Sequence, residues 1–142
     1  MRVVFDTNVY ISAFVIPGSL SEDAYRRARD GEIDLFTSVA ILTELAARLR
    51  EKFEWSEDRI RAALKAISRT AHVVKTTPRL AVVRDAADNR ILECAEDVDA
   101  DLIVTGDPHL LKLRRFGRAG IVRVSTFLRT LGRGTPTRWQ VR

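Results

Sequence analysis

Hydrophobic residues follow two kinds of pattern along the chain. Short uninterrupted apolar runs, typical of strands buried on both faces of a sheet, predict strands at residues 2–5, 33–37, 71–75, 102–105 and 121–124. Elsewhere, apolar residues recur every three or four positions, which is typical of helices with one buried face. This periodicity predicts helices over 7–15, from 21 to a stop at Gly31, over 39–53, from 56 onward, and over 88–98, 108–113 and 125–131.

The order of these elements predicts an α/β domain. Strands that alternate with one or two helices form a parallel sheet with helices on both faces. The chain has 142 residues, which is long enough for one domain with a substantial core, and we place this domain at residues 1–131. Residues 132–142 are rich in Gly, Pro, Thr and Arg and are predicted to be a loose basic tail, in which Trp139 is suited to anchoring on a partner surface.

Helical periodicity also predicts which residues face the core. On the second helix these are Leu20, Ala24, Tyr25 and Ala28, and on the third they are Val39, Leu42, Leu45, Ala46, Leu49 and Phe53. His72 lies in a predicted strand, where a hydrogen-bonded core histidine is expected. Residues 80–83 are expected to be extended.

Aspartates follow two of the predicted strands. Asp6 comes directly after 2–5, and Asp107 comes two residues after 102–105. Because parallel strands end at the same edge of a sheet, both carboxylates are expected at the edge where open α/β sheets bind ligands. Two helices would add Glu44 and Asp88 to this edge. A cluster of acids there is hard to explain unless a cation fills it.

Each of these acids also has an ordinary structural interpretation. Asp6, Asp88 and Asp107 are suited to capping the helices that follow them, and Glu44 is suited to pairing with Arg48 one turn later. For any single acid this interpretation is favoured. It weakens when all four must converge on one place by accident.

Charge is distributed unevenly along the chain. The overall net charge of +5 combines 15 basic and 19 acidic residues up to position 107 with nine basic residues and no acid after it. A basic segment beside an acidic cluster suggests a polyanion bound through its phosphates, and four of these residues are predicted to contact its backbone: Lys112, Arg114, Arg115 and Arg118. A solvated basic surface is the ordinary alternative, and charge alone favours it. The apolar runs are too short to span a membrane, and the single cysteine, Cys94, suits a reducing cytoplasm.

The acids favour metal-dependent phosphodiester hydrolysis. Carboxylate oxygens suit Mg²⁺ or Mn²⁺ and not zinc, and such an ion activates water and neutralises phosphoryl charge. Asn8 and Thr105, each two residues from an acid, are suited to holding a ligand oxygen or a water. No GxGxxG or GxxxxGK[ST] motif is present, and the two histidines, His72 and His109, do not make a convincing acid–base pair for a metal-free ribonuclease.

Four segments resemble the PIN-domain family, in particular the VapC-like toxin nucleases of toxin–antitoxin pairs. They are VVFDTNV at 3–9, TEL at 43–45, D-x-x-D-N at 85–89 and IVTGD at 103–107. The resemblance implies a three-layer α/β/α fold with a parallel sheet of about five strands, Mg²⁺- or Mn²⁺-dependent endoribonuclease activity, a homodimer, and a cognate antitoxin that blocks the acidic site. Residue by residue, it implies that Asp6, Glu44, Asp88 and Asp107 are the family's acids and that Asn8 and Thr105 are its supporting polar positions.

The sequence departs from the family pattern at His109. Members often carry another aspartate two residues after the TGD acid, so His109 puts a second metal ion in doubt. We expect an exposed helix residue there, although contact with a phosphate or protonation of a leaving group is open to it. Asp85 is expected to face solvent.

Three functional hypotheses follow. The preferred one is a metal-dependent toxin ribonuclease with Asp6, Glu44, Asp88 and Asp107 as ligands. The second is a catalytically weak PIN-like module that binds RNA or a partner without cutting. The third is a phosphoaspartate phosphatase with Asp6 as nucleophile, although the segment from Asp6 to Val9 lacks the second aspartate of the DxDx[TV] pattern.

Overall fold

A six-stranded sheet forms the centre of the computed structural model, which describes residues 1–132. Its strands are β1 (Arg2–Phe5), β2 (Asp34–Ser38), β3 (His72–Val74), β4 (Leu102–Val104), β5 (Arg115–Phe116) and β6 (Ala119–Val122). The strand order is β3-β2-β1-β4-β6-β5, and every neighbouring pair is parallel except β5 with β6. The predicted α/β class and its five parallel strands are confirmed. The antiparallel β5 was not predicted, since a two-residue strand carries no periodic signal.

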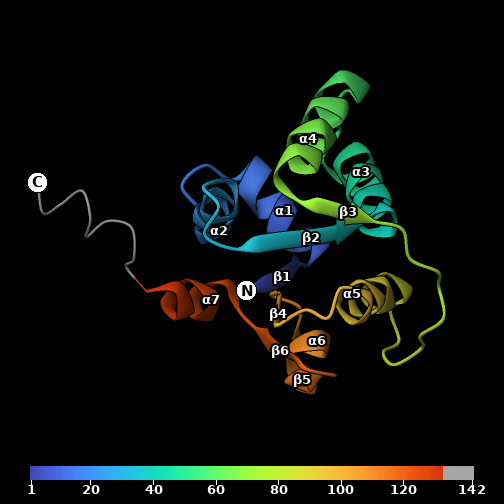
Figure 1. The fold of residues 1–142 in the computed structure, drawn as a ribbon. Helices are drawn as coiled ribbons and strands as arrows, with labels where there is room; N and C mark the ends of the chain where they lie inside the picture. Colours follow the sequence, from blue (N-terminus) through green and yellow to red (C-terminus); the bar gives the residue numbers. More distant parts are fainter. Residues whose placement is uncertain (133–142) are drawn as a thin grey trace, which may run out of the picture.

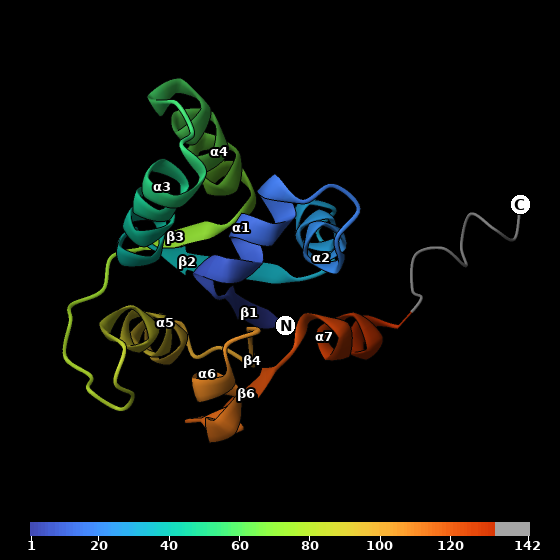
Figure 2. The same ribbon diagram turned by 180° about the vertical axis from the view of Figure 1, so that it is seen from behind.

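Seven helices surround this sheet in the described part of the chain. They are α1 (Thr7–Val15), α2 (Leu20–Arg29), α3 (Val39–Phe53), α4 (Glu57–Thr70), α5 (Ala86–Asp97), α6 (Pro108–Leu113) and α7 (Val124–Leu131). Figures 1 and 2 show α1 to α4 gathered around β2 and β3, and α6 beside β6. α5 packs against β1, β2 and α3, and α7 packs against α2. Within residues 1–132, no helix combines the length and apolar character needed to cross a bilayer.

β1 lies at the middle of the sheet and of the core. Val3, Val4 and Phe5 are fully buried, and β1 pairs with β2 on one side and with β4 on the other. The ring of Phe5 packs against Tyr10 of α1 at 5.6 Å and edge-on against Phe127 of α7 at 5.8 Å. An uninterrupted apolar run is therefore required at β1, because both of its faces are covered.

Several helix starts differ from the predictions. α5 begins at Ala86, and its N-cap is Asp85, whose carboxylate accepts a hydrogen bond of 2.8 Å from the Ala87 N–H. Asp88 therefore lies inside the first turn and does not cap the helix. α7 begins at Val124, with Arg123 at its N-cap position, one residue before the predicted start at 125.

Some predicted core positions lie at the surface. Leu20, Val39 and Phe53 are exposed because they lie in the first or last turn of their helices, beyond the reach of the sheet. On α3 the predicted Leu45 and Leu49 are buried together with Ile41, and Leu42 and Ala46 are half-buried. His72 is also exposed, against the prediction of a core histidine, and its ring lies 4.8 Å from that of Phe36. Residues 80–83 form a loop and not a strand.

Candidate active site at the carboxyl ends of β1 and β4

A pocket of about 570 Å³ lies where β1 and β4 end, between α3 and the start of α5. Its lining includes all four predicted acids and Asn8, namely Asp6, Asn8, Glu44, Asp88 and Asp107. These residues come from four separate parts of the chain. The fold thus brings to one pocket the side chains that the sequence pattern placed at one sheet edge.

Thr105 fixes the two aspartates that follow the strands. Its hydroxyl donates a hydrogen bond of 2.6 Å to Oδ2 of Asp6 and accepts one of 2.9 Å from the Asp107 N–H. Both Asp6 and Thr105 are buried, and the side chain of Asp6 makes no capping hydrogen bond to α1. Burial raises the pKa of Asp6, and the Thr105 hydrogen bond acts in the opposite direction.

Asp88 carries the most strongly shifted carboxyl group of the pocket. Burial, followed by the nearby Asp107 and Asp6 carboxylates, raises its pKa to about 7. Asp107 also caps α6, since its Oδ2 accepts a hydrogen bond of 3.1 Å from the Leu110 N–H. The capping interpretation is therefore correct for Asp107, and it coexists with a place in the pocket.

The D-x-x-D-N motif serves three purposes. Asp85 caps α5 and Asp88 faces the pocket, whereas Asn89 holds the preceding loop. Oδ1 of Asn89 accepts hydrogen bonds from the Val82 and Val83 N–H groups at 2.9 and 3.0 Å, and its Nδ2 donates to the Val83 carbonyl at 2.8 Å. Sequence reasoning missed this loop-holding role, although a polar residue inside an apolar helical stripe was a visible signal.

Glu93 supports the same loop from one turn further along α5. It is fully buried, and its Oε2 accepts hydrogen bonds from the Arg79 and Leu80 N–H groups at 2.6 and 2.7 Å. Nε of Arg90 lies 2.7 Å from its Oε1. Burial alone would raise the pKa of Glu93, but these hydrogen bonds and the Arg90 charge hold the pKa below its ordinary value.

Glu44 does not make its expected ion pair. It lies one turn before Arg48 on α3, yet the part of the chain that the structure describes contains no ion pair between them. Both residues line the acid pocket, together with Lys52. Arg48 and Lys52 were not predicted as site residues, since their position depends on how α3 packs against α5.

The donor set suits a divalent cation in kind. The four acids supply hard oxygen ligands, and the like charges that act on Asp88 are what a cation would offset. However, among residues 1–132 no three His, Cys, Asp or Glu side chains are gathered closely enough to hold a metal ion. The pocket therefore contains suitable donors without a closed ligand shell.

The predicted RNA-binding residues lie away from the pocket wall. Arg118 pairs with Asp99 and Asp101, which precede β4 and so lie at the opposite edge of the sheet from the acids. Lys112, Arg114 and Arg115 are exposed and do not line the acid pocket, and their contact with RNA stays a prediction. Trp139 and the other residues of the predicted tail beyond 132 lie outside the described residues.

His109 is exposed on α6, as expected. It lines a neighbouring pocket of about 540 Å³ together with Arg84 and Asp85. Asp85 is also exposed, and it lines the acid pocket as well. The two pockets therefore adjoin each other through Asp85.

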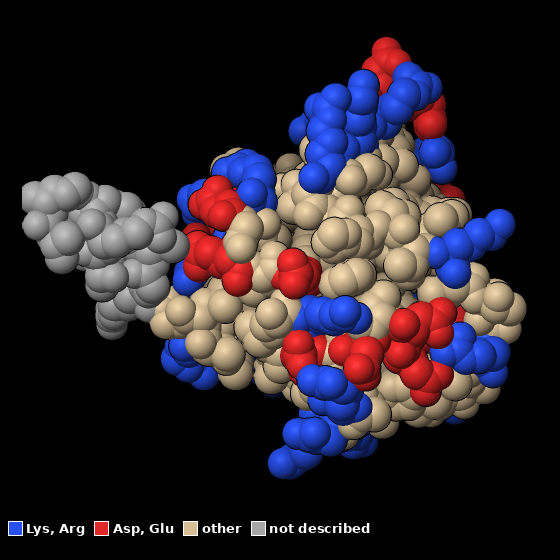
Figure 3. Space-filling model, in the orientation of Figure 1, with Lys and Arg blue, Asp and Glu red and all other residues tan. Residues whose placement is uncertain are grey.

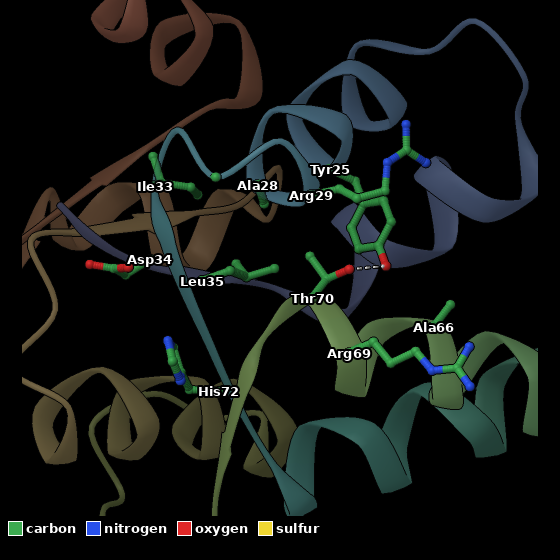
Figure 4. A pocket seen from close by; sticks show the side chains of 11 residues that line it. Tyr25, Ala28, Arg29, Ile33, Asp34, Leu35, Ala66, Arg69, Thr70 and His72 are labelled. Carbon is green, nitrogen blue, oxygen red and sulfur yellow. Dashed lines mark hydrogen bonds between the residues drawn. The ribbon is translucent and has the colours of Figure 1, made fainter.

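A further pocket, of about 540 Å³, lies at the other edge of the sheet. Figure 4 shows it between α2, α4 and the first residues of β2 and β3, with the Tyr25 hydroxyl donating to Thr70. Asp34 is the only carboxylate among its lining residues. Clustered acids are thus a property of the pocket at the carboxyl ends of the strands.

Comparison with known proteins identifies the fold family. The family model of the PIN domain matches residues 2–109, a range that contains all four acids. The chain belongs to the PIN domain family. This PIN domain is 34% identical over 119 residues to the uncharacterized protein MJ1680 of Methanocaldococcus jannaschii. The alignment covers 80% of this chain and 76% of the relative.

A solved structure has the same fold. VapBC2 from Rickettsia felis, bound to a DNA fragment from its promoter, superposes with a TM-score of 0.63 at 13% identity, covering 87% of this chain and 98% of that one. The resemblance to PIN domains and the three-layer α/β/α class are thereby confirmed. Membership of this family leaves no support for the phosphoaspartate phosphatase hypothesis.

Proposed function

We propose that this PIN domain is a Mg²⁺- or Mn²⁺-dependent endoribonuclease that hydrolyses phosphodiester bonds. PIN domains are generally nucleases, and the family match covers most of the chain. The observation that carries the proposal is the convergence of Asp6, Glu44, Asp88 and Asp107 on one pocket. Four acids from four segments at one sheet edge have no shared structural purpose.

Under this proposal each side chain has a defined part. Asp6, Glu44, Asp88 and Asp107 would hold the ion, which supplies a Lewis acid for activating water and for neutralising phosphoryl charge. Thr105 keeps the Asp6 carboxylate oriented through its 2.6 Å hydrogen bond. Asn8, half-buried in the pocket wall, presents an amide that can hydrogen-bond a phosphate oxygen or a water.

We further propose that the enzyme is the toxin of a toxin–antitoxin pair in the cytoplasm. Its fold is shared with VapBC2. A cognate antitoxin would act by covering the acid pocket, and a homodimer is the expected state of the free protein. The one cysteine, Cys94, is buried and unpaired, as suits a reducing compartment.

One observation favours the alternative of a catalytically weak binding module. The acids in the described part of the chain do not form a closed ligand shell. A module that grips RNA or a partner without cutting would need the pocket but not the ion.

Cleavage of a mixed-sequence RNA by the purified full-length protein separates these functions. The reaction is run with Mg²⁺, with Mn²⁺ and with EDTA, for the wild-type protein, for Asp6→Asn, and for Asp30→Asn, an exposed aspartate at the end of α2, as the matched control. Cleavage that requires the metal, disappears in Asp6→Asn and persists in Asp30→Asn supports the nuclease. No cleavage, with RNA binding that is the same in all three proteins, supports the binding module.

A further inference from the structure

Side chains that can bind phosphate line both the acid pocket and the pocket that adjoins it. Arg48 and Lys52 line the acid pocket from α3. Arg84 and His109 line the adjoining pocket, which shares Asp85 with the first. Potential phosphate contacts therefore line the acid pocket itself and the pocket that adjoins it at Asp85.

Arg48, Lys52 and Arg84 have no charged partner in the part of the chain that the structure describes. Among residues 1–132, none of the three takes part in an ion pair or donates a side-chain hydrogen bond, whereas the arginines that do form ion pairs are Arg26, Arg27, Arg50, Arg61, Arg79, Arg90 and Arg118. Arg48 has glutamates both one turn before it and three residues after it, at helical spacings where pairs commonly form. Its guanidinium is thus available to an anion that enters the pocket.

The spacing along α3 fits a nucleic acid strand. Glu44, Arg48 and Lys52 follow one another at four-residue intervals, so they lie on one side of the helix. Each interval corresponds to a rise of about 6 Å. This rise is close to the separation of successive phosphates in an extended single strand. If one phosphate lies near Glu44, the next two phosphates therefore lie near Arg48 and Lys52.

We propose that a single RNA strand crosses the acid pocket, with its phosphates on Arg48 and Lys52 on one side and on Arg84 and His109 on the other. This inference rests on the proposed nuclease function and specifies how that site holds its substrate. The four residues are positioning residues, and the scissile phosphate lies between the two groups. Lys112, Arg114 and Arg115, which the sequence suggested, lie outside this path.

Binding of a fluorescent single-stranded RNA of about eight nucleotides tests the path without any cleavage. The full-length Asp6→Asn protein in Mg²⁺ is the parent. Charge is removed in Arg48→Gln/Lys52→Gln and in Arg84→Gln, and as the matched control in Lys65→Gln/Arg69→Gln on α4, which has the same four-residue spacing and two exposed side chains. Figure 3 shows the Lys and Arg side chains of α4 gathered at the top of the molecule in that view, and neither control residue lines the acid pocket.

We expect the Arg48/Lys52 double variant to bind at least tenfold more weakly, and Arg84→Gln several-fold more weakly, than the parent and the α4 control. The slope of log affinity against log salt should fall by roughly 0.7 for each lost phosphate contact. Arg48→Lys, which keeps the charge, should retain affinity within about threefold of the parent. If the double variant fails to fold, Arg84→Gln, at an exposed residue, still tests the path.

Two outcomes would overturn the path. One is an Arg48/Lys52 double variant that binds like the parent, and the other is a larger loss in Lys112→Gln/Arg114→Gln/Arg115→Gln than in the pocket variants. Failure of the proposed nuclease function looks different, since wild-type protein would then leave RNA intact while binding still depended on Arg48 and Lys52.

Discussion

Thr105 donates a hydrogen bond of 2.6 Å to the carboxylate of Asp6, although the two residues are 99 positions apart in the chain. The same hydroxyl oxygen accepts the backbone N–H of Asp107. One small side chain thus sets the relative position of the acids that end β1 and β4.

Replacing Thr105 by valine should disrupt the pocket without enlarging it. Valine has nearly the same shape but cannot donate to Asp6 or accept from Asp107, so we expect RNA cleavage to fall about 10- to 100-fold. The lost hydrogen bonds should lower the free energy of unfolding by about 1–3 kcal/mol. Thr105→Ser, which keeps the hydroxyl, is the control for both the cleavage rate and the denaturant midpoint. Equal loss in the serine and valine variants would contradict a role for this hydroxyl.

The raised pKa of Asp88 predicts that the stability of the protein depends on pH. The pKa of Asp88 is about 7 in the folded protein and near 4 in an unfolded chain, so folding favours the protonated carboxyl group. The contribution of Asp88 to the free energy of unfolding is therefore fully present below pH 4 and is lost as the pH rises through 7. Without divalent cations, Asp88→Asn should therefore match the wild-type protein at pH 4 and exceed its melting temperature at pH 8 by about 2–4 °C, allowing for solvent screening. Thermal melts in EDTA at the two pH values provide the comparison. A constant difference between the proteins across this range would exclude the effect.

Asn89→Ala should loosen the loop before α5. The substitution removes the hydrogen bonds to Val82 and Val83, and we expect it to cost about 2–3 kcal/mol and to speed hydrogen exchange at these two amides. Asn89→Asp retains the accepting oxygen and should preserve most of the protection. If exchange at Val82 and Val83 were unchanged in Asn89→Ala, some other contact would have to hold the loop.

Phe127 attaches α7, which lies beyond the matched family region, to the middle of the sheet. The ring is fully buried against Phe5, so Phe127→Ala should lower the free energy of unfolding by about 3–5 kcal/mol. Phe127→Leu, which retains most of the volume, should cost much less. Denaturant titrations of the three proteins measure both effects, and a loss of under 1 kcal/mol in the alanine variant would mean that α7 contributes little to the core.

The sequence pattern was sufficient where one signal determined the structure. The bounds of β1, α1 and α3 agree with the predicted ranges, because each combines an apolar pattern with a clear start. It failed where two signals had the same chemistry. Asp85 and Asp88 are equally good caps by residue type, and only the packing of α5 decides that the first caps and the second faces the pocket.

The basic residues that line the acid pocket could not be predicted, because contacts between distant parts of the sequence determine their position. The approach of Glu44, Asp88 and Asp107 could be inferred from strand ends and helix positions. The orientation of Arg48 and Lys52 could not, since local spacing on α3 favours a pair with Glu44 that the fold does not form. The β5–β6 hairpin was missed for the opposite reason, because two residues are too few for any periodic pattern.

The central place of β1 has a consequence for synthesis of the protein. The ribosome makes Asp6, Asn8 and Glu44 early, while Thr105 and Asp107 follow much later, and β4 must still pair with β6 near the end of the chain. A growing polypeptide therefore carries half of the acids but cannot assemble the pocket. We expect the nascent protein to be inert toward the message and the ribosome that produce it, with activity arising only as the last strand and helix emerge.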